Sequence, residues 1–149
     1  MKRRIARENA FIAAFSATFA SATLAEIIAD SRECGEYAVD EYGEALLINY
    51  EAHKEEIDTL ISTKLKDWTL ARIPRTSATI LRLATAEMLY ADEDIDSIVI
   101  NEAVEIAKKY CAQEDYQFIN GVLGAIARAE DRAPRASLSV EAPCDEKAE

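Results

Sequence analysis

The sequence has little of what sharp turns and sheets require. Its 149 residues include only four glycines and three prolines. Runs of valine and strict two-residue alternation of apolar and polar residues are both rare. Half of the residues are apolar, and Ala, Leu and Ile, together with Glu, dominate the composition. This composition predicts an all-α domain built around a single hydrophobic core.

Cysteine and histidine are also scarce. Cys34, Cys111 and Cys144 are odd in number and widely spaced, and His53 is the one histidine of the chain. This usage excludes a disulfide framework and leaves too few ligands for a zinc site. We therefore expect reduced thiols in the cytoplasm and no bound metal.

Long apolar runs are missing as well. The opening "MKRRIARENAFIAAFSATFASATLA" has the outline of a signal peptide, with a positive start and small residues at its end. However, Glu8 and Asn9 separate the charges from the apolar run, and Ser16, Thr18 and Ser21 interrupt that run. No stretch approaches the roughly 18 apolar residues of a membrane span. We expect neither export nor a membrane anchor.

Motifs of common enzymes do not occur. The sequence has no glycine-rich phosphate loop, no G-x-S-x-G elbow and no H-E-x-x-H pair. Glu87, Glu102 and Glu105 lie in apolar-rich segments and could form a carboxylate pair, since Glu102 and Glu105 share a helix face. No nucleophile or metal ligand accompanies them. We therefore expect these acids to be bonded to neighbouring arginines and backbone, and the protein to be no enzyme and to need no cofactor.

Positive charge is concentrated at the start of an otherwise acidic chain. The formal net charge is −11, yet "KRRIAREN" holds four cations in eight residues. Overall acidity argues against coating nucleic acid with the whole surface but permits a local basic patch. At 100° per residue, Arg3, Arg4 and Arg7 gather on one helix face, which predicts an outward anion site. The apolar residues gather beside them: Ile5, Ile12, Phe15 and Phe19, with Phe11 at the border.

Periodicity predicts further helices along the chain. Residues 21–35 form a looser stretch that ends in a turn at Gly35. Thr76 or Ser77, and Asp96 or Ser97, are candidate caps for two of the later helices. Residues 133–149 have two prolines and no periodicity, so we expect a disordered acidic tail after a helical domain over residues 1–132. The expected helices cover residues 37–50, 53–68, 76–91, 98–111 and 115–129, and residues 92–96 connect two of them.

Several residues allow two interpretations. Arg82 lies among apolar neighbours, so it forms an interhelical ion pair with Glu102 or another acid, or it emerges to meet phosphate. Tyr110 and Phe118 bracket a helix junction behind Lys108 and Lys109. These rings either seal the junction or stack on unpaired bases, which offer π-faces to any aromatic side chain. Gly121 inside a helix suggests close approach of another backbone.

Four ordered motifs resemble the NusB transcription antitermination family. They are "RRIARENAFIAAFS", "ILRLATAEML", "INEAVEIAKKY" and "FINGVL", and the match covers residues 3–16 and about 68–128. Residues 21–63 match only in being helical. The sequence departs from the family at Ser77, where many members have an acid, and at Ala86, where many have Tyr.

The resemblance implies an all-α fold of about seven helices in two packed bundles. It also implies a bacterial cytoplasmic protein that binds the boxA element of ribosomal RNA leaders with the ribosomal protein NusE, in an antitermination complex on RNA polymerase. In the family, the arginine-rich start and the aromatic junction contribute to the RNA surface. The corresponding residues here are Arg3, Arg4, Arg7, Tyr110 and Phe118, with Arg82 and Gln117 as neighbours.

Two alternatives stay open at this point. The chain could be related to the RNA-targeting portion of an rRNA methyltransferase, an architecture that needs a second, cofactor-binding domain. It could also be an interaction module, in which small residues such as Ala13, Ala14 and Ala17 permit close helix packing in a homodimer that hides the arginine face.

Overall fold

The predicted all-α architecture is confirmed. The computed structural model describes residues 2–19, 21–91 and 96–129, and these ranges contain seven helices and no strand. Residues 92–95 of the expected connection and the expected disordered tail, 133–149, lie outside the described residues. The helices are α1 (Arg3–Ala17), α2 (Leu24–Cys34), α3 (Glu41–Ala52), α4 (Lys54–Thr63), α5 (Arg75–Tyr90), α6 (Asp96–Tyr110) and α7 (Gln113–Arg128).

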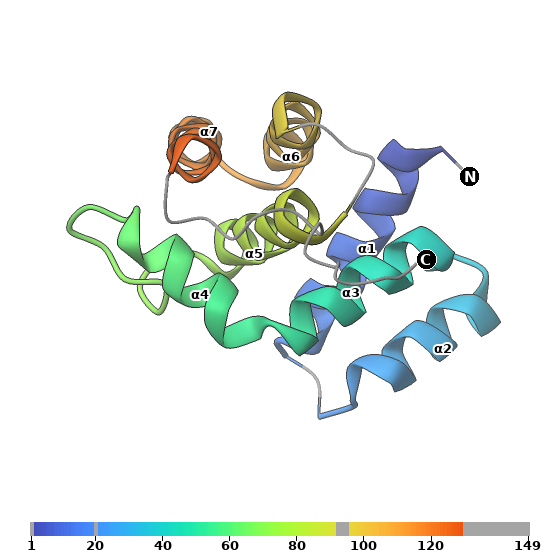
Figure 1. Cartoon of the computed structure of the whole chain (residues 1–149). Helices are drawn as coiled ribbons and strands as arrows, with labels where there is room; N and C mark the ends of the chain where they lie inside the picture. Colours follow the sequence, from blue (N-terminus) through green and yellow to red (C-terminus); the bar gives the residue numbers. More distant parts are fainter. Residues whose placement is uncertain (1, 20, 92–95, 130–149) are drawn as a thin grey trace, which may run out of the picture.

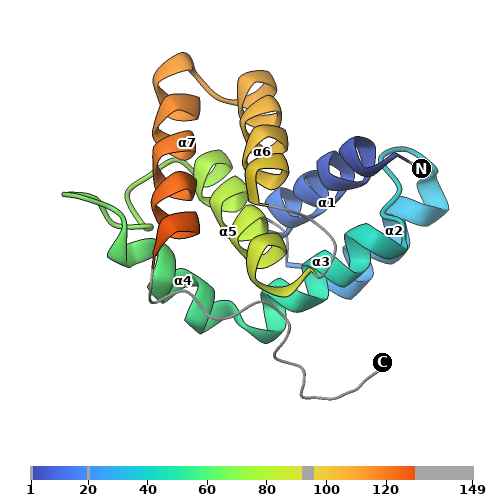
Figure 2. The ribbon, with the colours of Figure 1, turned by 45° about the horizontal axis from the view of Figure 1, so that its top comes forward.

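The helices form two groups that meet at α5. In one group α1 packs against α2 and α3, and in the other α5, α6 and α7 pack together with α4 beside them (Figures 1 and 2). Both α1 and α3 also pack against α5, which joins the two groups. The prediction of two packed bundles is therefore confirmed. None of the described helices is long and apolar enough to span a membrane.

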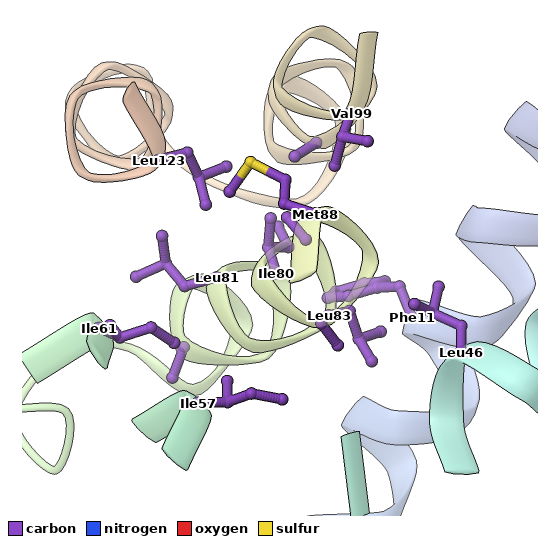
Figure 3. Close-up of a cluster of buried hydrophobic side chains, with 14 of the residues drawn as sticks. Phe11, Leu46, Ile57, Ile61, Ile80, Leu81, Leu83, Met88, Val99 and Leu123 are labelled. Carbon is purple, nitrogen blue, oxygen red and sulfur yellow. The ribbon is translucent and has the colours of Figure 1, made fainter. Parts of the chain in front are cut away.

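The hydrophobic core surrounds α5. Twelve residues of this helix are buried, and they meet side chains from the helices on both sides (Figure 3). Leu81 and Met88 are fully buried among partners that include Leu123 of α7 and Ile61 of α4. Burying such a side chain contributes about 1.5–3 kcal/mol, so this core fixes the orientation of α6 and α7 on α5.

Helix α2 corrects the expectation of a looser stretch over residues 21–35. The side chain of Thr23 accepts a hydrogen bond from the Glu26 amide, and the Glu26 carboxylate accepts one from the Thr23 amide. This reciprocal capping box starts the helix. The predicted turn at Gly35 is confirmed, because Gly35 ends the helix with a left-handed φ of 83°.

Two further local predictions were wrong. Helix α5 begins at Arg75, directly after Pro74, so Thr76 and Ser77 lie inside it and neither caps it. Gly121 lies against no other group of the described residues, since a Cβ built there would have nothing within 4 Å. Close backbone approach occurs instead at Gly43, where a Cβ would lie 3.4 Å from the carbonyl oxygen of Ala6 in α1.

The faces of α1 also differ from the prediction. Phe11, expected at the border, is buried in the core, whereas Ile5 and Phe19, expected on the core face, are exposed. The core side of α1 is instead formed largely by small residues. Ala13 is one of them, so it packs inside the molecule and is not available to a homodimer interface.

Candidate nucleic-acid interface

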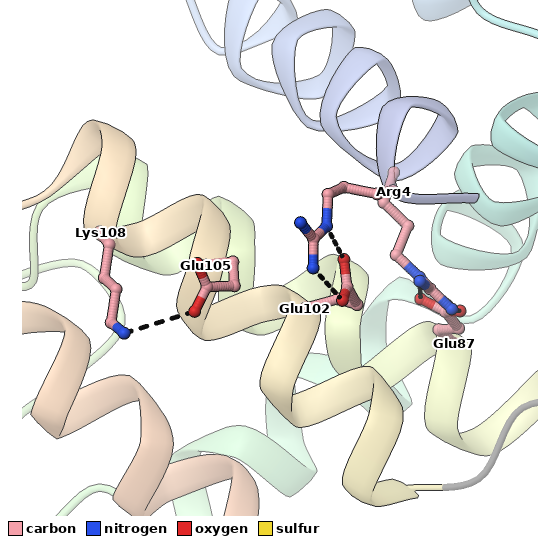
Figure 4. Close-up of polar contacts among 6 residues, drawn as sticks. Arg4, Glu87, Glu102, Glu105 and Lys108 are labelled. Atoms are coloured by element: carbon pink, nitrogen blue, oxygen red, sulfur yellow. Dashed lines mark hydrogen bonds and ion pairs between the residues drawn. The ribbon is translucent and has the colours of Figure 1, made fainter. Parts of the chain in front are cut away.

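Arg4 extends from the first turn of α1 toward α6. Its Nε and Nη2 donate hydrogen bonds of 2.9 and 3.0 Å to the two carboxylate oxygens of Glu102 (Figure 4). The Arg4 side chain remains 66% exposed. The hydrogen bond from Arg4 holds the pKa of Glu102 below its usual range, so this carboxylate stays ionised at neutral pH. Arg4 is therefore oriented by α6 and still reachable from solvent.

Glu8, one turn further along α1, bonds to the end of α6. Its carboxylate accepts hydrogen bonds from Lys109 Nζ at 2.6 Å and from the Tyr110 hydroxyl at 2.5 Å. These bonds, led by that from Lys109, lower the pKa of Glu8. The start of α1 thus lies along α6, with Arg4 beside Glu102 and Glu8 beside Lys109 and Tyr110. We call the surface formed by Arg4, Lys109 and Tyr110 the α1–α6 edge.

Tyr110 is held in place by its neighbours but remains partly exposed to solvent. Its ring packs against Phe11 with 5.1 Å between the ring centroids, yet the residue is 36% exposed. Partial burial, reinforced by the hydrogen bond to Glu8, raises the pKa of Tyr110 to about 12. The phenol is therefore neutral at physiological pH and adds no negative charge where an anionic ligand would approach.

Arg3 leaves α1 in another direction. It is exposed, and its guanidinium carbon lies 3.8 Å from the centroid of the Tyr42 ring of α3. Such stacking is a cation–π contact that restrains the side chain. Arg3 and Arg4 thus lie on the surface beside different helices, α3 and α6.

The prediction that Arg7 shares an outward cationic face was wrong. The side chain of Arg7 is only 8% exposed and that of Glu87 is 3% exposed. Arg7 Nε lies 2.9 and 3.0 Å from the two Glu87 oxygens, and Nη2 lies 2.7 Å from one of them. The Tyr42 hydroxyl donates to the same carboxylate. This cluster ties α1, α3 and α5 together inside the molecule.

Arg82 extends toward α4. Its Nε donates a 3.0 Å hydrogen bond to Asp58, with both side chains about a quarter exposed. Of the two interpretations offered by the sequence, the interhelical ion pair is therefore confirmed, with Asp58 as the partner in place of Glu102. This contact holds the Arg82 guanidinium against α4.

Gln117 and Phe118 lie on α7 but face different recesses. Gln117 is exposed and lines a groove with residues of α6. Phe118 is half-buried and lines a recess of about 530 Å³ with Trp68 and Pro74. Glu114 and Asp115 belong to the same recess and make it acidic. The junction between α6 and α7 is therefore only partly sealed by its aromatic rings.

The three glutamates considered as catalytic candidates are each paired with a cation. Glu87 pairs with Arg7, Glu102 with Arg4, and Glu105 with Lys108 at 3.3 Å. This agrees with the expectation that they are bonded to neighbouring side chains. Among the described residues, no group of three or more His, Cys, Asp or Glu side chains is placed to hold a metal ion.

Sequence reasoning missed the acid that organises this surface. Glu8 follows Arg7 in the basic segment, but nothing in its spacing indicates that it bonds residues about a hundred positions away. Tyr42 was also missed, because it lies in the part of the chain that matches the family only in being helical.

The fold and its surface together define a class of protein. A small helical domain that displays cations and a partly exposed aromatic ring on one edge has the features that proteins use to bind single-stranded nucleic acid. The chain belongs to the NusB family, whose model matches residues 4–128.

Individual relatives agree with this assignment. The transcription antitermination protein NusB of Geobacter sulfurreducens is 36% identical over 128 residues, covering 84% of this chain and 93% of that protein. A NusB structure from T. maritima has a TM-score of 0.76 at 31% identity, covering 95% of this chain and 99% of that one. The crystal structure of antitermination factors NusB and NusE in complex with dsRNA contains a similar chain, with a TM-score of 0.72 at 27% identity, covering 85% and 96%.

Proposed function

We propose that this protein is a cytoplasmic transcription antitermination factor. In this proposal it binds the boxA element of nascent ribosomal RNA leaders together with NusE and helps RNA polymerase read through terminators. The comparisons support the proposal, since the Geobacter sulfurreducens relative is a transcription antitermination protein and one similar chain was crystallised with NusE and dsRNA. The protein acts by binding and catalyses no reaction.

The observation on which the RNA surface rests is the α1–α6 edge. Arg4 and Lys109 are exposed cations from segments about a hundred residues apart, and the two pairings with Glu102 and Glu8 bring them to one side of the molecule. Tyr110 donates to the same Glu8 carboxylate of α1 as Lys109 does, and the residue is partly exposed. Cations position the RNA backbone, while stacking and base-edge contacts supply sequence preference.

The remaining candidates take different roles in this proposal. Arg3 extends the cationic surface beside Tyr42, and Gln117 extends the RNA surface along α7. Phe118 offers a half-buried ring for stacking, in the separate recess that Glu114 and Asp115 make acidic. Arg7 and Arg82 are assigned to structure, because one is buried against Glu87 and the other is held by Asp58. The acidic body around this small surface discourages indiscriminate binding.

Replacing Arg4 by Ala should weaken binding to every single-stranded RNA tested. Each lost phosphate contact should flatten the dependence of log K on log salt by about 0.7. Fluorescence anisotropy at several salt concentrations measures this slope. Arg72→Ala is a matched control, because Arg72 is an exposed arginine of the loop before α5. An Arg4→Ala slope equal to that of Arg72→Ala and wild type would remove Arg4 from the interface.

A further inference from the structure

An open polar groove runs between α6 and α7 and begins at the α1–α6 edge. It has a volume of about 890 Å³, and Arg4 lies among its lining residues. The two helices pack side by side along it (Figure 2), and only Cys111 and Ala112 connect them. The groove is therefore a continuation of the surface to which RNA binding is assigned.

Three side-chain amides line this groove. Asn101 comes from α6, whereas Gln117 and Asn120 lie one turn apart on α7, and all three residues are exposed. None of the three amides makes a side-chain hydrogen bond within the described part of the chain. An amide offers donors and an acceptor side by side, and this pattern pairs with the edge of a nucleobase.

The two glutamates of the groove disfavour a phosphate beside the amides. Glu102 and Glu105 lie on the same side of α6, and their carboxylates would repel a phosphate (Figure 4). A base is uncharged and carries amino and imino donors, which a carboxylate can accept. Each carboxylate has about four acceptor positions, so pairing with Arg4 or Lys108 leaves others open.

Lys108 and Tyr116 complete the groove at its other end. Lys108 Nζ lies 5.6 Å from the centroid of the Tyr116 ring, which is half-buried and also lines the groove. Arg4 and Lys108 are thus exposed cations that line the same groove. Arg4 is held at Glu102 and Lys108 at Glu105, so the two cations lie at different positions along α6. A chain of phosphates passing these cations would direct its bases toward the amides.

We propose that the groove between α6 and α7 is a nucleobase-binding subsite for single-stranded RNA. Asn101, Gln117 and Asn120 read base edges there, and Arg4 and Lys108 hold the adjoining backbone. Bases in a duplex present neither their pairing edges nor an extruded face, so the subsite takes unpaired nucleotides. The inference rests on the proposed function, since it assigns the base contacts of the same RNA surface.

The test is the double variant Asn101→Ala with Asn120→Ala, and Gln113→Ala is the matched control. Gln113 is an exposed amide at the start of α7 that does not line the groove. Ala favours helix at all three positions, and circular dichroism verifies that the variants fold. The probes are a boxA-containing RNA, a scrambled RNA of equal length, and an abasic strand of equal length, each measured by fluorescence anisotropy.

We expect the double variant to lose about tenfold in discrimination between the boxA and scrambled RNAs, as for the loss of one good bidentate contact. Its affinity for the abasic strand and its salt slope should equal those of Gln113→Ala. If the wild-type protein distinguishes boxA from scrambled RNA and the double variant does so equally well, the nucleobase subsite is overturned while the proposed function stands. An equal loss of affinity for all three strands would overturn the subsite in the same way. Failure of the wild-type protein to bind any of the strands would instead overturn the proposed function, and this inference with it.

Discussion

Replacing Glu87 by Ala should lower the free energy of unfolding by about 3–5 kcal/mol, because the change leaves a buried cation without its partner. Arg7 donates to both oxygens of Glu87, and the two side chains are almost fully enclosed. The same carboxylate accepts the Tyr42 hydroxyl, so its removal also leaves that donor to find another acceptor. Chemical denaturation measures the loss as a lower midpoint at an unchanged m-value.

Glu105→Ala provides the matched control for this prediction. Glu105 also lies in a helix and pairs with a cation, Lys108, but both side chains are about half exposed. Exposed pairs contribute about 0–1 kcal/mol, so this variant should remain close to wild type. Equal, small effects of the two substitutions would show that the Arg7–Glu87 cluster does not stabilise the fold.

The double variant Arg7→Met with Glu87→Leu should recover much of the stability that Glu87→Ala loses. Replacing a whole buried ion pair by apolar side chains of similar volume is often neutral or stabilising, whereas breaking the pair is costly. Recovery would identify the uncompensated charge as the cause of the loss. The same variant should still bind RNA, since neither residue belongs to the α1–α6 edge.

NusE should raise the affinity of this protein for boxA RNA by about 100-fold. The α1–α6 edge is small and lies on a chain with a formal net charge of −11, so it holds RNA weakly by itself. A bound partner that contacts the same RNA makes the second contact intramolecular, which increases overall affinity by roughly 10²–10⁴. Titrating labelled RNA with the protein in the presence and absence of saturating NusE measures this gain.

Arg4→Ala supplies the control for that comparison. It should weaken binding both with and without NusE, because it removes a phosphate contact and leaves the protein partner unaffected. If NusE changes the affinity of the wild-type protein by less than about threefold, the two proteins do not share the RNA, contrary to the coupling proposed here.

Much of the fold follows from the sequence because apolar periodicity marks most of the helices. Helix α1 shows where this reasoning fails. A helical wheel placed Ile5 and Phe19 on the core face, yet the buried positions include Ala6, Ala10 and Phe11. Alanines signal burial weakly, and here they are buried because α1 lies close against α3 at Gly43. The small size of Gly43, which is distant from α1 in sequence, therefore decides which face of α1 is buried.

The candidate site was predictable in outline and not in its pairings. The family motifs led to Arg4 and Tyr110, which lie on one edge. The motifs did not indicate that Arg4 and Arg7 have different roles. The two arginines are only three residues apart in α1, yet Arg7 pairs with the buried Glu87 and Arg4 with Glu102 at the surface. Which carboxylate each arginine meets depends on how α5 and α6 pack on α1, and spacing within one segment contains no information about that.

The most direct test of the RNA surface is nuclear magnetic resonance of the ¹⁵N-labelled protein titrated with boxA RNA. The account predicts that the largest chemical-shift changes occur in the first two turns of α1, along residues 101–110 and in residues 116–120, with those in α2 and α4 nearly unchanged. Changes confined to α2 and α4, or no change at saturating RNA, would contradict the assignment of RNA binding to the edge where α1 meets α6.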